Sequence, residues 1–282
     1  MAYGTTHIPD TAAGRAPRAR RRFRFGNLSD HFLLIASLGA FAFLYAPILV
    51  LIIFSFNDNP VTVLPLRGFT LGWYEKAFAN ADMMAAILNS FYVGFSAVAL
   101  CLLIGVPAAF ALDRYEFRGK VLFRRFSLLP ITLPGIITGI AMMNMFRAVG
   151  MDLSLFTVIL GHGTALTAVV ITQVFARLQR FNRTLEEASS DLGGRPWQTF
   201  MFVTLPNIRS AIIGSSLLSF TLSFDEIPVT FFLTGRENTL PMYIYSTIRR
   251  GITPEINAIG TLIVVASLAL ILISVYLLQK EE

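Results

Sequence analysis

Long apolar stretches separated by short polar segments dominate the pattern along the chain. The first runs without a charged residue from Phe32 to Phe56. At 1.5 Å per residue it makes a helix of about 37 Å, which crosses a bilayer with some tilt. Five further apolar stretches of similar character follow, at 83–112, 127–146, 154–176, 208–233 and 256–279. The pattern therefore predicts an all-α, polytopic membrane protein with six transmembrane helices.

The segment before the first span, residues 1–31, is polar and carries six arginines. We expect a disordered basic arm on the cytoplasmic side, held near anionic lipid headgroups. A nucleic-acid partner is not expected, because only Phe23 and Phe25 are nearby as stacking residues. The first span exceeds a signal-peptide core and lacks a small-residue cleavage site, which favours an uncleaved anchor. Residues 32–282 then form the transmembrane domain, with 83–279 as its core.

The placement of positive charge predicts the orientation of the spans. Seventeen of the 23 Lys and Arg residues lie in the N-terminal arm, the 113–126 and 177–209 loops and the C-terminus. Positive residues stay preferentially cytoplasmic, so both termini and the 183–206 loop are expected inside. The same placement accounts for the net charge of +6 in a chain of 282 residues that is 55% hydrophobic and only 14% charged.

The polar passage 183–206 is patterned as two short amphipathic helices joined by glycine. Thr184 and Glu187 have the spacing of a capping box, which predicts a helix start. Gly193 and Gly194 predict its end, because glycine adopts the left-handed C-cap conformation without steric cost. Pro196 suits the first turn of the second helix. The pattern favours a docking element at the membrane surface, with an ordinary surface loop as the alternative.

This passage resembles the EAA loop of the permeases of ABC importers. The resemblance rests on Glu187-Ala188-Ser189, Gly193, Val203 and Leu205-Pro206. Ser189 stands where the family has a second Ala, and Val203 stands where it has Ile. Both differences are mild, and the apolar flanks match.

The resemblance implies the type I importer permease fold in a bacterial inner membrane. It implies that the loop fits a cleft on an ATP-binding subunit, present as a dimer, and passes its motion to the spans. It further implies a second, homologous permease subunit and a periplasmic solute-binding protein as partners. The residues that would serve ATPase coupling are Glu186, Glu187, Ala188, Asp191, Gly193, Leu205 and Pro206.

Two adjacent carboxylates, Asp225 and Glu226, lie within the fifth predicted span. Ionisable groups in a hydrocarbon span are costly and usually face a cavity or a partner. Pro228 predicts a kink beside them, which would free backbone oxygens for a polar ligand. One hypothesis is that the two acids line the substrate pathway. The alternative is that they pair with an arginine near the outer interface, Arg236 or Arg147.

Other embedded polar positions favour packing. Gly135 and Gly139 form a small-xxx-small pattern typical of close helix contact. His162 has no second His or Cys in a metal-binding spacing, so we expect it to pack. Cys101, the single cysteine, is expected to be a small buried residue.

The motifs that the sequence lacks help to distinguish a transport subunit from an enzyme. The chain has no GxxxxGK[ST] phosphate loop, so we expect no cofactor on this chain, and ATP with Mg on a partner subunit. It also lacks HExxH and GxSxG, so we do not expect an enzyme. The alternatives to an importer permease are an energy-independent carrier or channel and a membrane enzyme or assembly factor.

The C-terminal third resembles the second permease subunit of spermidine/putrescine importers, through residues 219–235 and 239–262. Those relatives commonly carry Asp-Asp-Phe where this chain has Asp225-Glu226-Ile227. The resemblance implies import of a polyamine such as putrescine or spermidine. Two carboxylates in a passage of low dielectric also suit a cationic solute. Because related permeases also serve opines, γ-aminobutyrate and other small amines or acids, the identity of the solute stays open.

Overall fold

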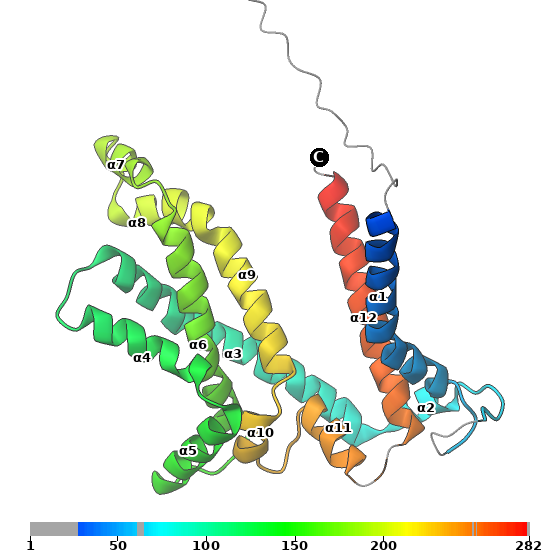
Figure 1. Ribbon diagram of the computed structural model, residues 1–282. Coiled ribbons are helices and arrows are strands. Elements are labelled where there is room, and N and C mark those ends of the chain that lie inside the picture. The colour runs from blue at the N-terminus through cyan, green and yellow to red at the C-terminus, as the bar shows by residue number, and fades with distance from the viewer. Residues whose placement is uncertain (1–27, 61–64, 250, 252, 281–282) are drawn as a thin grey trace, which may run out of the picture. The chain divides into compact units, whose positions relative to one another are not determined.

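Every regular element in the described part of the chain is a helix (Figure 1). The computed structural model describes residues 28–60, 65–249, 251 and 253–280. Two compact units make up the chain, Met1–Val50 and Leu51–Glu282. The predicted basic arm falls almost wholly on residues 1–27, outside the described residues, and the first helix begins at Leu28.

Thirteen helical elements follow one another along the described residues. They are α1 (Leu28–Ser55), α2 (Gly72–Ala79), α3 (Ala81–Arg114), α4 (Lys120–Thr132), α5 (Gly135–Ala148), α6 (Leu155–Gln179), α7 (Thr184–Asp191), α8 (Pro196–Thr199), the π-helical turn η1 (Phe200–Thr204), α9 (Leu205–Phe224), α10 (Pro228–Leu233), α11 (Leu240–Ile248) and α12 (Pro254–Lys280).

Four helical stretches in the described residues are long and apolar enough to cross a membrane: His31–Ser55, Ala81–Arg114, Leu155–Gln179 and Pro196–Phe224. A fifth crossing results if α4 and α5 together form one broken span. The sixth predicted span coincides with α12, a helix of 27 residues. The membrane character and the helical class are confirmed, while the count of six spans and the sidedness of the termini stay predictions.

The third predicted span, 127–146, is not one straight helix. Helix α4 ends at Thr132 and α5 begins at Gly135, with a bend of 107° between them. Pro134 explains the break, because a proline disfavours the helical conformation in the residue before it. Leu133 accordingly has an extended backbone, with ψ at 138°.

The fifth predicted span, 208–233, is also interrupted. Helix α9 stops at Phe224 and α10 starts at Pro228, so Asp225, Glu226 and Ile227 lie in a non-helical break. The expected kink is therefore a full interruption. Proline without an N–H is well suited to the first position of a new helix, where no intrahelical partner would be needed.

Helix α6 is the centre of the second unit and packs against α3, α9 and α4. One apolar core joins Val170 and Val174 of α6 to Cys101 of α3 and Ile208 of α9. The expected burial of Cys101 is confirmed, since its side chain is inaccessible. A second core joins α3, α5, α6 and α10. Figure 1 shows α7 and α8 at one end of α6, with α5 and α10 at the other end.

Candidate functional sites in the loop 183–206 and at the break in the fifth span

Helix α7 starts where the pattern predicted, but with a different cap. The expected capping box between Thr184 and Glu187 does not form. Instead, the Asn182 side-chain oxygen accepts hydrogen bonds from the Thr184 backbone N–H at 3.1 Å and from its hydroxyl at 2.8 Å. An Asn side chain can hydrogen-bond to the backbone two residues further along the chain. Because Asn182 fills this role, the Glu187 carboxylate takes no part in the cap.

The glycine pair ends α7 as predicted. Gly193 has a φ of +83°, in the left-handed region that a side chain disfavours. The Gly194 N–H donates to the Ser189 carbonyl at 2.9 Å. A Cβ on Gly194 would lie 2.7 Å from that carbonyl oxygen, so the chain can turn this tightly only with glycine.

The second helix of the loop is not a short one. Pro196 begins α8 as expected, but α8 continues through η1 into α9, giving an uninterrupted helical stretch from Pro196 to Phe224. The predicted pair of short helices is therefore one short helix, α7, followed by the start of a span. Pro196 and α9 thus belong to one helical stretch.

The residues predicted for ATPase coupling divide into two groups. Glu187, Ala188, Asp191, Gly193 and Pro206 are exposed, whereas Glu186 and Leu205 are partly buried. Two apolar residues close to the exposed group in the sequence are exposed as well: Leu192 is 90% exposed and Trp197 is 65% exposed. The outward face of the loop thus presents carboxylates next to bare apolar surface.

Glu186 is turned inward. Its carboxylate accepts hydrogen bonds from the Arg114 guanidinium at 2.9 Å and from the Thr204 hydroxyl. Arg114 ends α3 and Thr204 lies in η1, so Glu186 joins three elements of this chain. The sequence pattern placed Glu186 and Glu187 together, and only the fold separates their surroundings.

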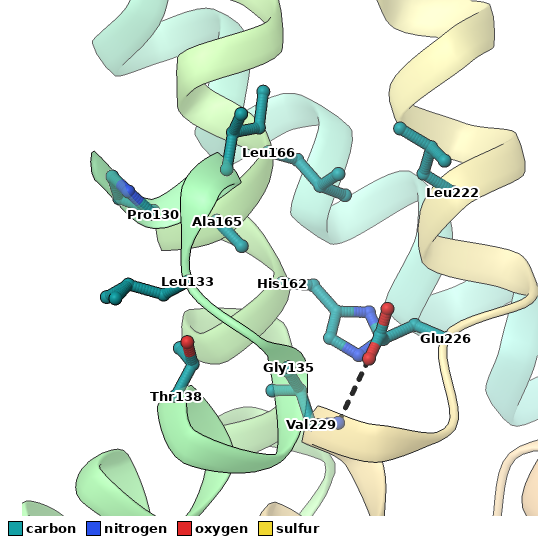
Figure 2. Close-up of a pocket in the computed structure, with 11 residues that line it drawn as sticks. Pro130, Leu133, Gly135, Thr138, His162, Ala165, Leu166, Leu222, Glu226 and Val229 are labelled. Atoms are coloured by element: carbon teal, nitrogen blue, oxygen red, sulfur yellow. Dashed lines mark hydrogen bonds between the residues drawn. The ribbon is translucent and has the colours of Figure 1, made fainter. Parts of the chain in front are cut away.

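The second candidate site is a cavity of about 250 Å³ beside the break in the fifth span (Figure 2). Glu226 lines it together with His162 and Leu222, and residues around the α4–α5 bend close another side. The break between α4 and α5 and the break between α9 and α10 therefore meet at one cavity. Polar and apolar groups both face it.

Glu226 also caps α10. Its carboxylate accepts a hydrogen bond from the Val229 N–H at 3.0 Å, shown as the dashed line in Figure 2. A carboxylate at a helix N-terminus satisfies a backbone donor that has no intrahelical partner. This role was not foreseen from the sequence, although Glu226 and Pro228 are spaced for it.

Asp225 differs from its neighbour. Its side chain is exposed, and it makes no ion pair or side-chain hydrogen bond with any described residue. Among the described residues neither acid pairs with Arg147 or Arg236, so that alternative finds no support. The two carboxylates thus have separate surroundings, one fixed at a helix start and one unengaged.

His162 holds the two sides of the break together. Its Nδ1 lies 2.8 Å from the Ser223 hydroxyl of α9, and its Nε2 lies 2.9 Å from the Thr230 hydroxyl of α10. The ring is buried, so both nitrogens find partners within the fold. The expected packing role is confirmed, with hydrogen bonding added to it.

The small residues of α5 permit close approach to α10. A Cβ on Gly139 would lie 2.9 Å from the Phe232 ring and 3.2 Å from the Pro228 carbonyl oxygen. On Gly135 it would lie 3.1 Å from the Pro228 side chain. The predicted packing role of this pair is confirmed.

Known proteins with similar sequences are membrane transport subunits. Spermidine/putrescine transport system permease protein PotC of Haemophilus influenzae is 34% identical over 243 residues, which are 86% of this chain and 94% of that protein. Putrescine transport system permease protein PotI of Escherichia coli K12 is 37% identical over 250 residues, which are 86% of this chain and 89% of that protein.

Solved structures agree on the fold. A bacterial ABC transporter that imports the acidic polysaccharide alginate contains a chain that matches with a TM-score of 0.69 at 19% identity, covering 90% of this chain and 98% of that one. The MetNI methionine ABC transporter matches with a TM-score of 0.55 at 18% identity, covering 70% of this chain and 91% of that one.

A family profile completes the assignment, since it spans well over half of the chain. Residues 101–280 match the profile described as binding-protein-dependent transport system inner membrane component. The matched region includes the 183–206 loop, the cavity and both breaks. The chain therefore belongs to the family of inner membrane components of binding-protein-dependent transport systems.

Proposed function

We propose that this chain is a permease subunit of an ATP-driven importer that moves a small cationic solute of the putrescine and spermidine class into the cytoplasm. The observation that carries the proposal is the similarity to PotC and PotI, which extends over 86% of the chain. Both relatives are named as permeases for polyamines. The matches to solved structures, at 19% and 18% identity, support the fold of the chain but give no information on its solute.

In this proposal the 183–206 loop seats against an ATP-binding subunit. The exposed carboxylates of Glu187 and Asp191 supply charge contacts, and Leu192 and Trp197 supply the apolar contact area. ATP and Mg are bound by a dimer of that subunit, and this chain binds no cofactor. The continuous helix from Pro196 into α9 then carries the motion of the loop toward the cavity.

The remaining partners follow from the same proposal. A second homologous permease completes the pathway in the inner membrane, and a periplasmic solute-binding protein delivers the solute. A transporter structure similar in fold was solved in complex with a pentasaccharide-bound periplasmic protein, which supports delivery of this kind. The loop 183–206 and both termini face the cytoplasm.

Charge complementarity supports a cationic solute. Asp225 has no partner among the described residues, and Glu226 lines the cavity beside it. A cation entering this region compensates the desolvation of the carboxylates, as the carboxylates compensate that of the cation. We assign Asp225 the direct contact with solute, and Glu226 the shaping of the cavity wall. A zwitterion such as γ-aminobutyrate or an opine is the alternative solute.

Uptake in cells tests the choice of solute. A strain lacking the gene is compared with the same strain carrying it, using labelled putrescine, spermidine and γ-aminobutyrate. The proposal predicts gene-dependent uptake of one or both polyamines that excess unlabelled polyamine suppresses. Uptake of γ-aminobutyrate alone would show that the alternative solute, and not a polyamine, is imported. Gene-dependent uptake that persists when the partner ATPase is inactivated would indicate an energy-independent carrier instead.

A further inference from the structure

One buried carboxylate lies at the end of α3, and nothing above assigns it a role. The Asp113 side chain is completely inaccessible. It accepts hydrogen bonds from the Gln179 side-chain amide and from the Arg183 guanidinium at 3.2 Å, and it contacts the Arg114 guanidinium at 3.3 Å. An isolated buried carboxylate is strongly disfavoured, so these three donors are what keeps it in the fold.

The donors come from different elements. Gln179 is the last residue of α6, and Arg183 directly precedes α7. Arg183 also donates to the Asp113 backbone carbonyl at 3.2 Å. The ends of α3 and α6 and the start of α7 therefore meet at a single side chain.

Arg114 extends the contact into the loop. Its guanidinium bridges Asp113 and Glu186, and Glu186 in turn accepts a hydrogen bond from Thr204 in η1. A continuous line of polar contacts thus runs from α3 through α7 to the turn that leads into α9. Two carboxylates and two guanidiniums balance in charge, so the group is neutral as a whole.

Apolar packing does little to orient α7. None of its residues is buried, and it packs mainly against α8 and η1. Beyond the polar line, the Ser189 hydroxyl lies 2.9 Å from the Thr199 hydroxyl. The η1 turn is π-helical, a rare form that is frequently found at functional sites. A charged contact, between Glu186 and Arg114, thus links α7 directly to α3.

We propose that Asp113, Arg114 and Glu186 form a positioning linkage that transmits movement of α7 to α3, in parallel with the covalent path from α8 into α9. The linkage rests on the proposed importer function. It reassigns Glu186 from contact with the ATPase to contact within this chain. Glu187 and Asp191 remain on the outward face. Two spans, α3 and α9, then move together when α7 is displaced.

The test uses the complete transporter in proteoliposomes, with Arg114→Gln and Asp113→Asn. Arg114→Gln cuts the bridge to Glu186 while Gln179 and Arg183 still satisfy Asp113. We expect both variants to assemble and hydrolyse ATP, with the solute imported per ATP reduced about tenfold, within the usual range of coupling between sites. Hydrogen exchange of 184–191, measured on the same complexes, should be faster in both variants.

Glu116→Gln is the matched control, because Glu116 lies near the same end of α3 and, among the residues that the structure describes, pairs only with Lys120 on the surface, at 2.7 Å. It should leave import per ATP and hydrogen exchange unchanged. Unchanged import per ATP and unchanged exchange in Arg114→Gln would overturn the linkage. If Asp113→Asn does not assemble, Arg114→Gln decides alone. A wild-type complex that imports nothing would count against the importer function, and the exchange of 184–191 would then decide the linkage separately.

Discussion

At the scale of single residues, neighbouring side chains of the same chemistry acquire different tasks from their backbone surroundings. Glu226 is fixed by the Val229 N–H at the start of α10, whereas Asp225, one residue earlier, has no partner among the described side chains. Glu186 and Glu187 divide in the same way, one inward and one outward. Glu186 and Glu187 are adjacent positions of helix α7, whose side chains diverge by about 100°. Asp225 and Glu226 are separated instead by the irregular backbone of the break between α9 and α10.

Neutralising Asp225 and Glu226 should separate import from assembly. Asp225→Asn with Glu226→Gln keeps the shape and removes both charges. We expect the complex to assemble and hydrolyse ATP while polyamine import falls by at least about tenfold, the factor that 1.4 kcal/mol of lost transition-state stabilisation produces. When the two substitutions are made one at a time, only Glu226→Gln should also lower the stability of the protein, by about 1 kcal/mol, because it weakens the cap of α10.

The control for that pair is Asp152→Asn, an exposed acid outside the cavity, which should change neither import nor stability. Normal polyamine import by the double variant at normal expression would exclude a pathway role. Loss of the protein from the membrane would instead indicate that the acids serve folding.

His162→Ala should destabilise the break. It leaves the buried Ser223 hydroxyl without its partner, which costs about 1–3 kcal/mol, whereas the Thr230 hydroxyl keeps its hydrogen bond to the Glu226 carbonyl. The measurement is the thermal midpoint of the purified complex. Thr164→Ala is the comparison, since the Thr164 hydroxyl is exposed and donates to the Leu160 carbonyl of its own helix. An unchanged midpoint in His162→Ala would show that the ring does not hold α9 and α10 together.

At the scale of elements, local signals were predictable and tertiary contacts were not. The end of α7 at Gly193 and the start of α8 at Pro196 follow from backbone preferences that act within a few residues. The apolar stretches predicted one span where the structure has α4 and α5, and one where it has α9 and α10, because hydropathy does not respond to a break in the backbone. The contacts of Asp113 with Gln179 and Arg183 join residues 66 and 70 positions apart, beyond the reach of any local pattern.

The left-handed turn after α7 offers a test of the loop as an element. Proline is restricted to φ near −65°, and Gly193 has +83°, so Gly193→Pro should redirect α7. We expect a complex that inserts into the membrane but whose ATP hydrolysis no longer responds to solute-loaded binding protein. The readout is the ratio of stimulated to basal ATPase activity.

Gly214→Ala supplies the control for that substitution, since a Cβ there meets no atom within 4 Å in the described structure. It should retain full stimulation. Stimulation at the wild-type level in Gly193→Pro would remove the docking role from the 183–206 loop.

At the scale of the whole molecule, the chain is one component of a transport system. Its family match covers 101–280, and the sequence contains no phosphate-binding loop for ATP. The exposed apolar surface on the outward face of the loop suits a protein partner. The account therefore predicts that purification of this chain from its native membrane yields an ATPase dimer and a second permease along with it.

ATP-dependent import into liposomes tests the central claim most directly. The purified complex is reconstituted with its binding protein and labelled putrescine or spermidine, and ATP is supplied on the side of the 183–206 loop. The account predicts accumulation of polyamine that requires both ATP and the binding protein, with no accumulation when the ATPase is inactivated. Equal uptake without ATP, or ATP-driven uptake that excludes both polyamines, would contradict it.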